Sequence, residues 1–307
     1  MHISYIKHSD IDKERWDKRI AESANQLIYA YSYYLDLMSK NWDALILNDY
    51  EAVMPLTWNK KFGISYLRQP AFTQQLGIFG NIFFDEKVTE SFINKALKIF
   101  PFAEINLNYA NEYKDGATNK CNLILPLNRS FQEIEKNFRK DFVSKLKNNN
   151  LIYEPANDAE SVIELFRENY DHKLRIALNT YHDWFLLCNQ LQSRGQILVR
   201  KVSTAEGQLI STALFLKDNR RIYYVMSTTL PAGRKQQANY FLLYQTIKEF
   251  AEQDLIFDFE GSEIPSIKSF FLKFGAVEQP YPFVKINNLS FPKKLLKNGY
   301  DYLKKIS

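Results

Sequence analysis

Both halves of the 307-residue chain contain the same order of predicted elements, and this order constrains the fold more than any other feature. Each half runs from helices through a set of antiparallel strands to a helix, a strand, a further helix and a last strand. No clear sequence repeat accompanies the repeated order. The pattern predicts an α+β fold with two tandem domains, each a mostly antiparallel mixed sheet flanked by helices.

The elements of the first half follow from the spacing of its apolar residues. Helices are expected over residues 10–24, 29–40 and 87–99, and strands over residues 44–47, 51–56, 64–68, 104–107 and 121–125. A basic helix over residues 130–148 follows, and Ser130 and Glu133 have the spacing of a capping box at its start. The domain boundary is therefore expected near Pro126, where the last strand ends.

The second half is interpreted in the same way. Helices are expected over residues 158–170, 182–193, 239–253 and 265–273, and strands over residues 151–154, 196–202, 209–216, 221–227, 257–260 and 283–286. Residues 228–237 are expected to form an exposed loop. The predicted organisation is an N-terminal domain at residues 1–125, a C-terminal domain at residues 126–290 that begins with the basic linking helix, and a basic tail at residues 291–307.

The composition is that of a folded protein without a membrane span. Hydrophobic residues make up 46% of the chain and charged residues 24%, so the chain can bury a substantial core. No stretch reaches the roughly 18 uncharged apolar residues that a membrane span needs, and the N-terminus lacks the apolar core of a signal peptide. Cys121 and Cys188 are too far apart in sequence for a redox or metal-ligand motif. We therefore predict a cytoplasmic protein without a metal site.

The net charge of +5 is too small for a dedicated nucleic-acid-binding protein, but the basic residues are clustered. One cluster lies in the predicted helix at residues 130–148, and the other lies in the tail at residues 291–307. On a helical wheel the tail separates its lysines from an apolar face. Such a helix can make a weak contact with an anionic membrane surface or pack against its own domain, and packing is the favoured interpretation.

Residues 257–262, with the sequence Phe-Asp-Phe-Glu-Gly-Ser, alternate apolar and acidic side chains before a glycine. The alternation predicts that Asp258 and Glu260 lie on the same side of a strand, at the end where α/β folds place functional groups. From this segment alone, a solvated face or a pair of helix caps is the favoured interpretation. Either carboxylate could accept a proton from an amine if burial and mutual repulsion raise its pKa from a value near 4.

Several segments of the second half resemble a known family. They are the run Arg221-Ile-Tyr-Tyr-Val-Met-Ser, Arg234 followed by Ala238-Asn239 at a helix start, the Phe-Asp-Phe-Glu-Gly-Ser segment, and the ending Phe270 to Phe274-Gly275. Together with the order of elements, they are similar to the GNAT acyltransferase fold. Two such domains in tandem resemble the FemAB family of peptidyl and acyl transferases, and this resemblance covers nearly the whole chain.

The resemblance implies an N-acyltransferase that moves an acyl or aminoacyl group to an amine, either of a small molecule or of a cell-envelope precursor. Asp258 and Glu260 are the implied catalytic residues. The implied substrate- or donor-binding residues are Tyr224, Arg234, Lys235, Asn239, Ser262 and Lys273. Acyl-CoA or aminoacyl-tRNA is the implied donor, so tRNA is one implied partner, and no cofactor is expected to be tightly bound.

Two features depart from the resemblance. GNAT domains typically bind the pyrophosphate of acyl-CoA with a turn of small residues at a helix N-terminus, whereas this chain has Gln237 and Asn239 there. FemAB members that use aminoacyl-tRNA also lack this turn. FemAB transferases commonly have a lysine where this chain has Phe271. Two alternatives therefore stay open, namely a CoA-dependent acetyltransferase of a small amine and a non-catalytic GNAT-fold protein that binds a ligand or partner.

Overall fold

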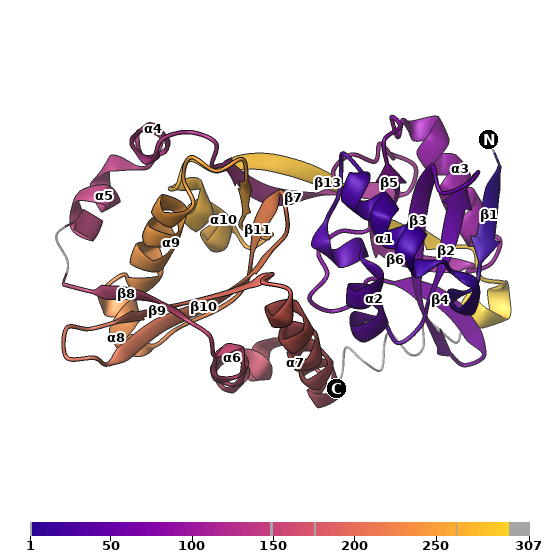
Figure 1. The fold of residues 1–307 in the computed structure, drawn as a ribbon. Coiled ribbons are helices and arrows are strands. Elements are labelled where there is room, and N and C mark those ends of the chain that lie inside the picture. The colour runs from indigo at the N-terminus through magenta and orange to yellow at the C-terminus, as the bar shows by residue number, and fades with distance from the viewer. Residues whose placement is uncertain (1, 148–149, 175, 262, 295–307) are drawn as a thin grey trace. The chain divides into compact units, whose positions relative to one another are not determined.

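The computed structural model describes residues 2–147, 150–174, 176–261 and 263–294, which form two compact units (Figure 1). The first unit contains Met1–Gln26, Ser39–Asn119 and Tyr281–Ser307, and the second contains Leu27–Met38 and Lys120–Pro280. Each unit thus combines segments that are far apart in the sequence. This division differs from a single boundary near Pro126, because a short N-terminal segment belongs to the second unit and a C-terminal strand to the first.

The first unit is a mostly antiparallel sheet with helices packed on it. Its helices are η1 (His8–Asp10), α1 (Lys13–Glu22) and α3 (Glu86–Leu97). Its strands are β1 (Ile3–Ile6), β2 (Trp42–Leu47), β3 (Ala52–Lys61), β4 (Ile64–Arg68), β5 (Phe79–Gly80) and β6 (Phe102–Asn106). The strand order is β1-β2-β3-β4-β6; β4 and β6 pair in parallel, and the other neighbouring strands in this order pair antiparallel. β2 and β3 form an antiparallel hairpin, and the predicted strands at residues 44–47, 51–56 and 64–68 are confirmed as β2, β3 and β4.

The second unit repeats this plan with longer strands. Its helices are η2 (Ile28–Ala30), α2 (Ser32–Met38), α4 (Phe131–Glu135), α5 (Lys140–Lys147), α6 (Ala159–Leu174), α7 (Leu178–Ser193), α8 (Pro231–Lys235), α9 (Ala238–Glu249) and α10 (Pro265–Leu272). Its strands are β8 (Ile152–Ala156), β9 (Ile197–Ser203), β10 (Leu209–Lys217), β11 (Arg221–Thr229) and β12 (Ile256–Asp258). β8 to β11 form an antiparallel set in sequence order, and β12 pairs with β11 in parallel.

Each unit is completed by a strand from the other half of the sequence. β7 (Ala117–Pro126) follows the first half but pairs with β12 of the second unit, from Ile124 to Pro126. β13 (Val277–Asn287) follows α10 but pairs with β6 of the first unit, from Phe283 to Asn287. The two halves of the sequence therefore cannot fold as independent sheets.

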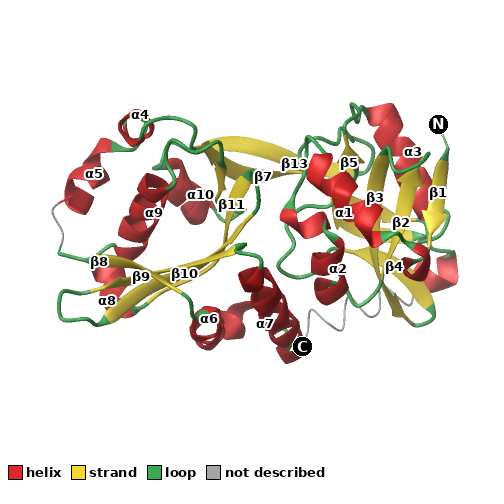
Figure 2. Cartoon of the chain, viewed as in Figure 1, coloured by secondary structure: helices red, strands yellow, loops and turns green. Residues whose placement is uncertain are grey.

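Helices cover both faces of the strands β9 to β11 in the second unit. Figure 2 shows α9 and α10 on one side of these strands and α6 and α7 on the other. The side covered by α9 holds the main apolar core, which includes Phe215, Leu242, Phe257 and Phe274. These side chains are almost fully buried, so the sheet packs closely against α9.

Two predicted elements differ from the structure. The basic helix predicted over residues 130–148 consists of two helices, α4 and α5, because Phe138 is buried in the core and the amide of Arg139 donates to the carbonyl oxygen of Lys273 at 2.8 Å. The capping box of Ser130 and Glu133 at the start of α4 is confirmed. The predicted loop at residues 228–237 contains the short helix α8.

The predicted tail helix at residues 291–307 falls mostly outside the described residues, which end at residue 294. Within the described part of the chain, no helix has the length and hydrophobicity that a membrane crossing requires.

Gly233 in α8 allows a close approach to the neighbouring strand. A β-carbon on this residue would lie 2.2 Å from the carbonyl oxygen of Ile210 in β10, which is closer than nonbonded atoms can come. We therefore expect Gly233→Ala to lower the free energy of unfolding by about 1–3 kcal/mol through overpacking, measured by urea denaturation. Gln236→Ala, at an exposed position just after α8, is the matched control and should stay within about 0.5 kcal/mol of wild type. Equal effects of the two substitutions would contradict this packing argument.

Candidate active site

The sheet of the second unit opens between β11 and β12. The two strands pair only from Arg221 to Tyr223 on β11 and from Ile256 to Asp258 on β12. After Asp258 the chain stays with β7, because the amide of Phe259 donates to the carbonyl oxygen of Leu123 at 2.9 Å. β11 continues to Thr229. Beyond Tyr223, no strand within the described residues pairs with the edge of β11 that faces β12. One edge of β11 is therefore open beside the end of β12.

Glu260 lies at this opening in an unusual backbone conformation. It has a φ of 61°, and the next residue, Gly261, has a φ of 52°, so both are left-handed. A β-carbon at Gly261 would lie 2.2 Å from the carbonyl oxygen of Cys121 on β7, so a glycine is needed there. The prediction that the strand extends to Glu260 is wrong, because β12 ends at Asp258. The turn that follows nevertheless keeps the two acids adjacent.

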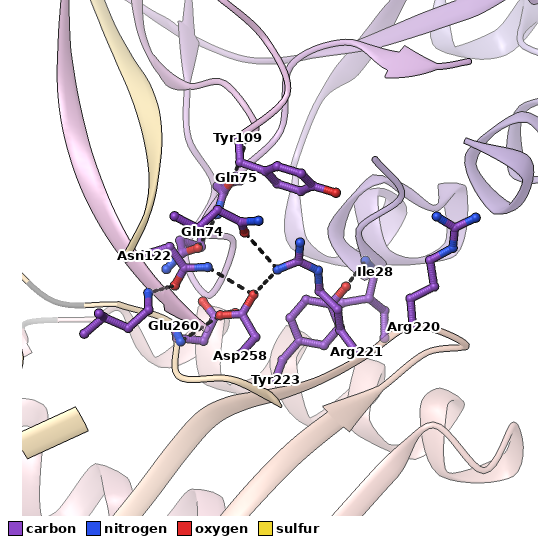
Figure 3. Close-up of polar contacts among 12 residues, drawn as sticks. Ile28, Gln74, Gln75, Tyr109, Asn122, Arg220, Arg221, Tyr223, Asp258 and Glu260 are labelled. Atoms are coloured by element: carbon purple, nitrogen blue, oxygen red, sulfur yellow. Dashed lines mark hydrogen bonds and ion pairs between the residues drawn. The ribbon is translucent and has the colours of Figure 1, made fainter. Parts of the chain in front are cut away.

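Asp258 is fixed by contacts to every side of its carboxylate (Figure 3). One oxygen accepts from the guanidinium of Arg221 at 2.7 Å and from the amide of Asn122 at 3.1 Å. The other accepts from the backbone amide of Glu260 at 2.9 Å. Asp258 and Arg221 are both almost fully buried. Asp258 is therefore a charged residue that positions Glu260, and its oxygens are already engaged.

A segment from the N-terminal part of the chain supplies the partner of Glu260. The hydroxyl of Tyr29 in η2 donates to Oε1 of Glu260. The ring of Tyr29 lies 5.4 Å from the ring of Tyr34 in α2 and 5.4 Å from the ring of Tyr223 in β11. Tyr223 in turn donates to Asp218 at 2.6 Å and accepts from the amide of Ile28 at 3.1 Å. Glu260 thus faces a group of buried tyrosines.

This environment changes the acidity of Glu260. Although part of the residue is exposed, its carboxyl group is enclosed, and this burial raises its pKa well above the ordinary value of 4.5. The negative charge of Asp258 raises the pKa further, while the hydrogen bond from Tyr29 and the charge of Arg221 act in the opposite direction. A carboxylate whose pKa is raised in this way is a stronger base than an ordinary glutamate, as proton abstraction from an amine requires.

Comparison with known proteins identifies the fold around this site. Residues 145–263 match the sequence profile of the acetyltransferase (GNAT) domain. The whole chain resembles the crystal structure of FemX, with 12% identity, a TM-score of 0.67 and coverage of 96% of this chain and 99% of that chain. The chain has the tandem GNAT fold. The predicted FemAB-like architecture is thereby confirmed, and the GNAT profile supports the predicted acyltransferase class.

Two further solved structures share this tandem GNAT fold. A conserved protein of unknown function from Bacteroides thetaiotaomicron is 12% identical, with a TM-score of 0.58 and coverage of 90% of this chain and 98% of that chain. A tandem GNAT protein from the clavulanic acid biosynthesis pathway is 10% identical, with a TM-score of 0.52 and coverage of 94% and 99%. No curated protein sequence matches the chain.

Tyr224 and Asn239, two of the predicted binding residues, lie together but away from Glu260. The hydroxyl of Tyr224 is 2.9 Å from Oδ1 of Asn239 at the start of α9 and 2.6 Å from the hydroxyl of Ser227. Its ring belongs to the apolar core under α9, whereas the neighbouring Tyr223 lies in the tyrosine group at Glu260. Burial raises the pKa of Tyr224 to about 12. Of the two adjacent tyrosines, Tyr223 is therefore the one beside the acids.

The predicted basic binding residues are also separated from Glu260. Arg234 is exposed and donates through Nε to the carbonyl oxygen of Thr229 at 3.0 Å, and Lys235 is exposed in the same short helix. Lys273 donates to the hydroxyl of Tyr240 in α9 at 2.6 Å. These residues occupy the α9 side of the GNAT domain. Ser262 lies outside the described residues.

Phe271 fills the position at which the FemAB resemblance implies a lysine. Its ring is almost fully buried, 4.9 Å from the ring of Phe259 and 6.1 Å from the ring of Tyr224. It therefore packs in the apolar core under α9, together with Phe259 and Tyr224. An ammonium group there would be surrounded by aromatic rings.

Sequence reasoning missed Tyr29, Arg221 and Asn122 as site residues. Residues 29–34 have the sequence Tyr-Ala-Tyr-Ser-Tyr-Tyr, and this density of tyrosine was a usable signal for a functional segment. Arg221 and Asn122 had no comparable signal, because their importance comes from pairing with Asp258 across three strands.

Within the described residues, no group of three or more His, Cys, Asp or Glu side chains is arranged to hold a metal ion.

Removal of Arg221 tests the role of the buried ion pair. Arg221→Met leaves the carboxylate of Asp258 buried without its cation, so we expect a loss of about 3–5 kcal/mol in the free energy of unfolding. Arg129→Met, at an exposed position of the same unit, is the control and should change the free energy by less than about 0.5 kcal/mol. Chemical denaturation of the two variants measures the difference. A loss below about 1 kcal/mol in Arg221→Met would show that the pair is dispensable.

The raised pKa of Glu260 makes stability depend on pH. Because the folded-state pKa lies above the unfolded value, folding favours the protonated form of Glu260. Its stabilising contribution is fully present below the ordinary pKa of 4.5 and is lost as pH rises through the raised value. Urea denaturation at pH values from below 4.5 upward should therefore show that the free energy of unfolding falls less with rising pH in Glu260→Gln than in wild type. Parallel pH profiles of the two proteins would exclude a raised pKa.

Proposed function

We propose that the protein is an N-acyltransferase in which Glu260 is the general base. The observation that supports this most strongly is the position of its enclosed carboxyl group at the opening between β11 and β12 of a GNAT domain. In the proposed reaction Glu260 takes a proton from the acceptor amine, directly or through water. The amine nitrogen forms a bond to the acyl carbon, and the bond from that carbon to the leaving group breaks.

The neighbouring residues have distinct roles in this proposal. Asp258 is a positioning residue, because its oxygens are held by Arg221, Asn122 and the amide of Glu260. Its fixed negative charge keeps the pKa of Glu260 high enough for proton transfer. Tyr29 orients the carboxyl group through its hydrogen bond to Oε1. Asp258 is thus a component of the site without being the base itself.

We propose a thioester such as acyl-CoA as the donor. A thiol has a pKa near 8.5 and leaves as a thiolate without prior protonation. The sugar oxygen released from aminoacyl-tRNA is a much stronger base, and its departure is helped by a nearby cation or proton donor. The position implied for such a cation is occupied by the buried ring of Phe271. Aminoacyl-tRNA is therefore the second candidate.

The phosphates of the donor are proposed to bind near the start of α9. Arg234 and Lys235 present exposed positive charges just before this helix, and the helix N-terminus itself favours negative charge. Gly233 serves packing against Ile210 and is not available for close phosphate contact. Side-chain cations, more than a glycine-rich turn, would therefore hold the phosphates.

The acceptor is proposed to be an amine. The amine of a cell-envelope precursor is the first acceptor to test, since the FemAB resemblance implies it, and a small free amine is the second. Contact of residues 291–307 with a membrane surface stays a prediction from the sequence.

Thermal unfolding with candidate donors tests the choice of donor. Acyl-CoA at about 100 times its Kd should stabilise the protein by about 2.7 kcal/mol and raise its Tm. Arg234→Gln with Lys235→Gln should reduce this shift, whereas Lys248→Gln at the other end of α9 should leave it unchanged. Absence of a shift with any acyl-CoA, together with binding of charged tRNA that weakens steeply with salt, would reverse the order of the two donors.

Substitution of Glu260 tests the catalytic role. Glu260→Gln should lower kcat by at least about 100-fold in an assay of amide formation, because the amide side chain cannot accept the proton. Glu206→Gln, at an exposed turn of the same domain, should leave kcat unchanged. In wild type, kcat/KM should rise with pH through the raised pKa of Glu260. If Glu260→Gln retains the full kcat with a donor that wild type uses rapidly, Glu260 is structural and the proposed mechanism fails.

A further inference from the structure

A groove between α6 and α7 has the features of a ligand site and is not used by the proposed reaction. Its volume is about 280 Å³. It is lined by Glu160, Ile163, Glu164 and Arg167 of α6 and by Leu178, Tyr181, His182 and Phe185 of α7. In each helix these residues follow the spacing i, i+3, i+4, i+7, so each contributes one continuous face. The two helices lie next to each other below the sheet in Figure 2.

The α6 side of the groove carries both signs of charge. Glu160 and Glu164 are exposed and lie one helical turn apart, and the half-buried Arg167 follows after a further turn. Within the described part of the chain, none of these three side chains forms an ion pair. Two like charges at i and i+4 destabilise a helix, whereas Arg167 follows Glu164 at the favourable i, i+3 spacing and lies near Tyr181, which also faces Asp171. A ligand ammonium group beside Glu160 and Glu164 would relieve their repulsion, and Arg167 offers a cation to the other end of the ligand.

The α7 side of the groove is mostly apolar. Leu178 is 69% exposed, although it stands in the first turn of a helix whose inner face is well packed. The ring of Tyr181 is buried, and Phe185 is half-buried one turn further along. Together with Ile163 from α6, these side chains form an apolar surface opposite the charged one. The groove is therefore divided into a charged side and an apolar side.

We propose that this groove binds an amino acid zwitterion with an apolar side chain. Arg167 would hold the carboxylate, and Glu160 and Glu164 would hold the ammonium group. The side chain of the ligand would pack against Leu178, Tyr181 and Phe185. A volume of about 280 Å³ lies just below the usual range of small-molecule pockets, about 300–1,000 Å³, which suits a single amino acid.

Other ligand classes fit these residues less well. A nucleotide is too large, and its phosphates would be repelled by Glu160 and Glu164. A purely apolar ligand would cover the charges without pairing them, which costs free energy. A simple amine would make no contact with the guanidinium of Arg167. The binding site is independent of Glu260, so its occupancy can be measured whether or not the proposed transfer reaction occurs.

Isothermal titration calorimetry with defined ligands tests the proposal. L-leucine and L-phenylalanine are expected to bind, whereas N-acetyl-L-leucine, which lacks the ammonium group, and L-leucinamide, which lacks the carboxylate, are expected to bind at least about tenfold more weakly. Arg167→Gln should weaken the binding of L-leucine at least about tenfold, so that L-leucine no longer binds more tightly than L-leucinamide. Glu164→Gln should reduce the advantage of L-leucine over N-acetyl-L-leucine.

The control variants remove one acidic and one basic side chain from the same helix. Glu168→Gln and Lys173→Gln replace exposed side chains of α6 that do not line the groove, so both should bind L-leucine as wild type does. Absence of binding of both amino acids up to about 10 mM would overturn the proposal. Equal binding of the blocked and free amino acids, or equal losses in Arg167→Gln and Lys173→Gln, would also overturn it. Glu260→Gln should bind L-leucine normally, which separates this site from the proposed catalytic residue.

Discussion

The buried ion pair of Asp258 and Arg221 is the interaction on which the centre of the GNAT domain depends. The nitrogen and oxygen atoms lie 2.7 Å apart, and the surroundings exclude water from both groups. Burial of two charges is tolerated only when hydrogen bonds satisfy the remaining polar atoms, and Asn122 and the amide of Glu260 provide them. Asn122, Asp258 and Arg221 come from β7, β12 and β11, so one network fixes three adjacent strands. The same network sets the charge beside Glu260.

The exchange of strands explains why this network could assemble from distant parts of the sequence. β7 belongs to the first half of the chain but carries Asn122 into the sheet of the second unit. The segment Leu27–Met38 also belongs to the second unit and brings Tyr29 to Glu260. A repeated order of elements predicts two similar domains, yet it gives no indication that each domain is completed by the other half. The site is therefore a property of the whole chain.

Local patterns predicted the regular elements well and the site only in part. The strand at residues 64–68 and the capping box at Ser130 follow from short-range rules, and both are confirmed. Alternation placed Asp258 and Glu260 together, but it could not show that the strand ends at Asp258 or that Glu260 and Gly261 have left-handed conformations. The break between α4 and α5 depends on burial of Phe138, which is a tertiary contact. Tyr29 was missed for the same reason, since its partner is 231 residues away.

The placement of charge also limits how the proposed reaction could be catalysed. Arg221, the cation beside the two acids, is already paired with Asp258. At the position where the resemblance implies a lysine, Phe271 packs against Phe259 and Tyr224. A negative oxygen that develops on the acyl group must then be stabilised by neutral donors. The open edge of β11 beyond Tyr223 offers backbone N–H groups that no strand pairs within the described residues. In the proposed mechanism, the divergence of β11 from β12 therefore makes room for the donor and also supplies the groups that stabilise its charge.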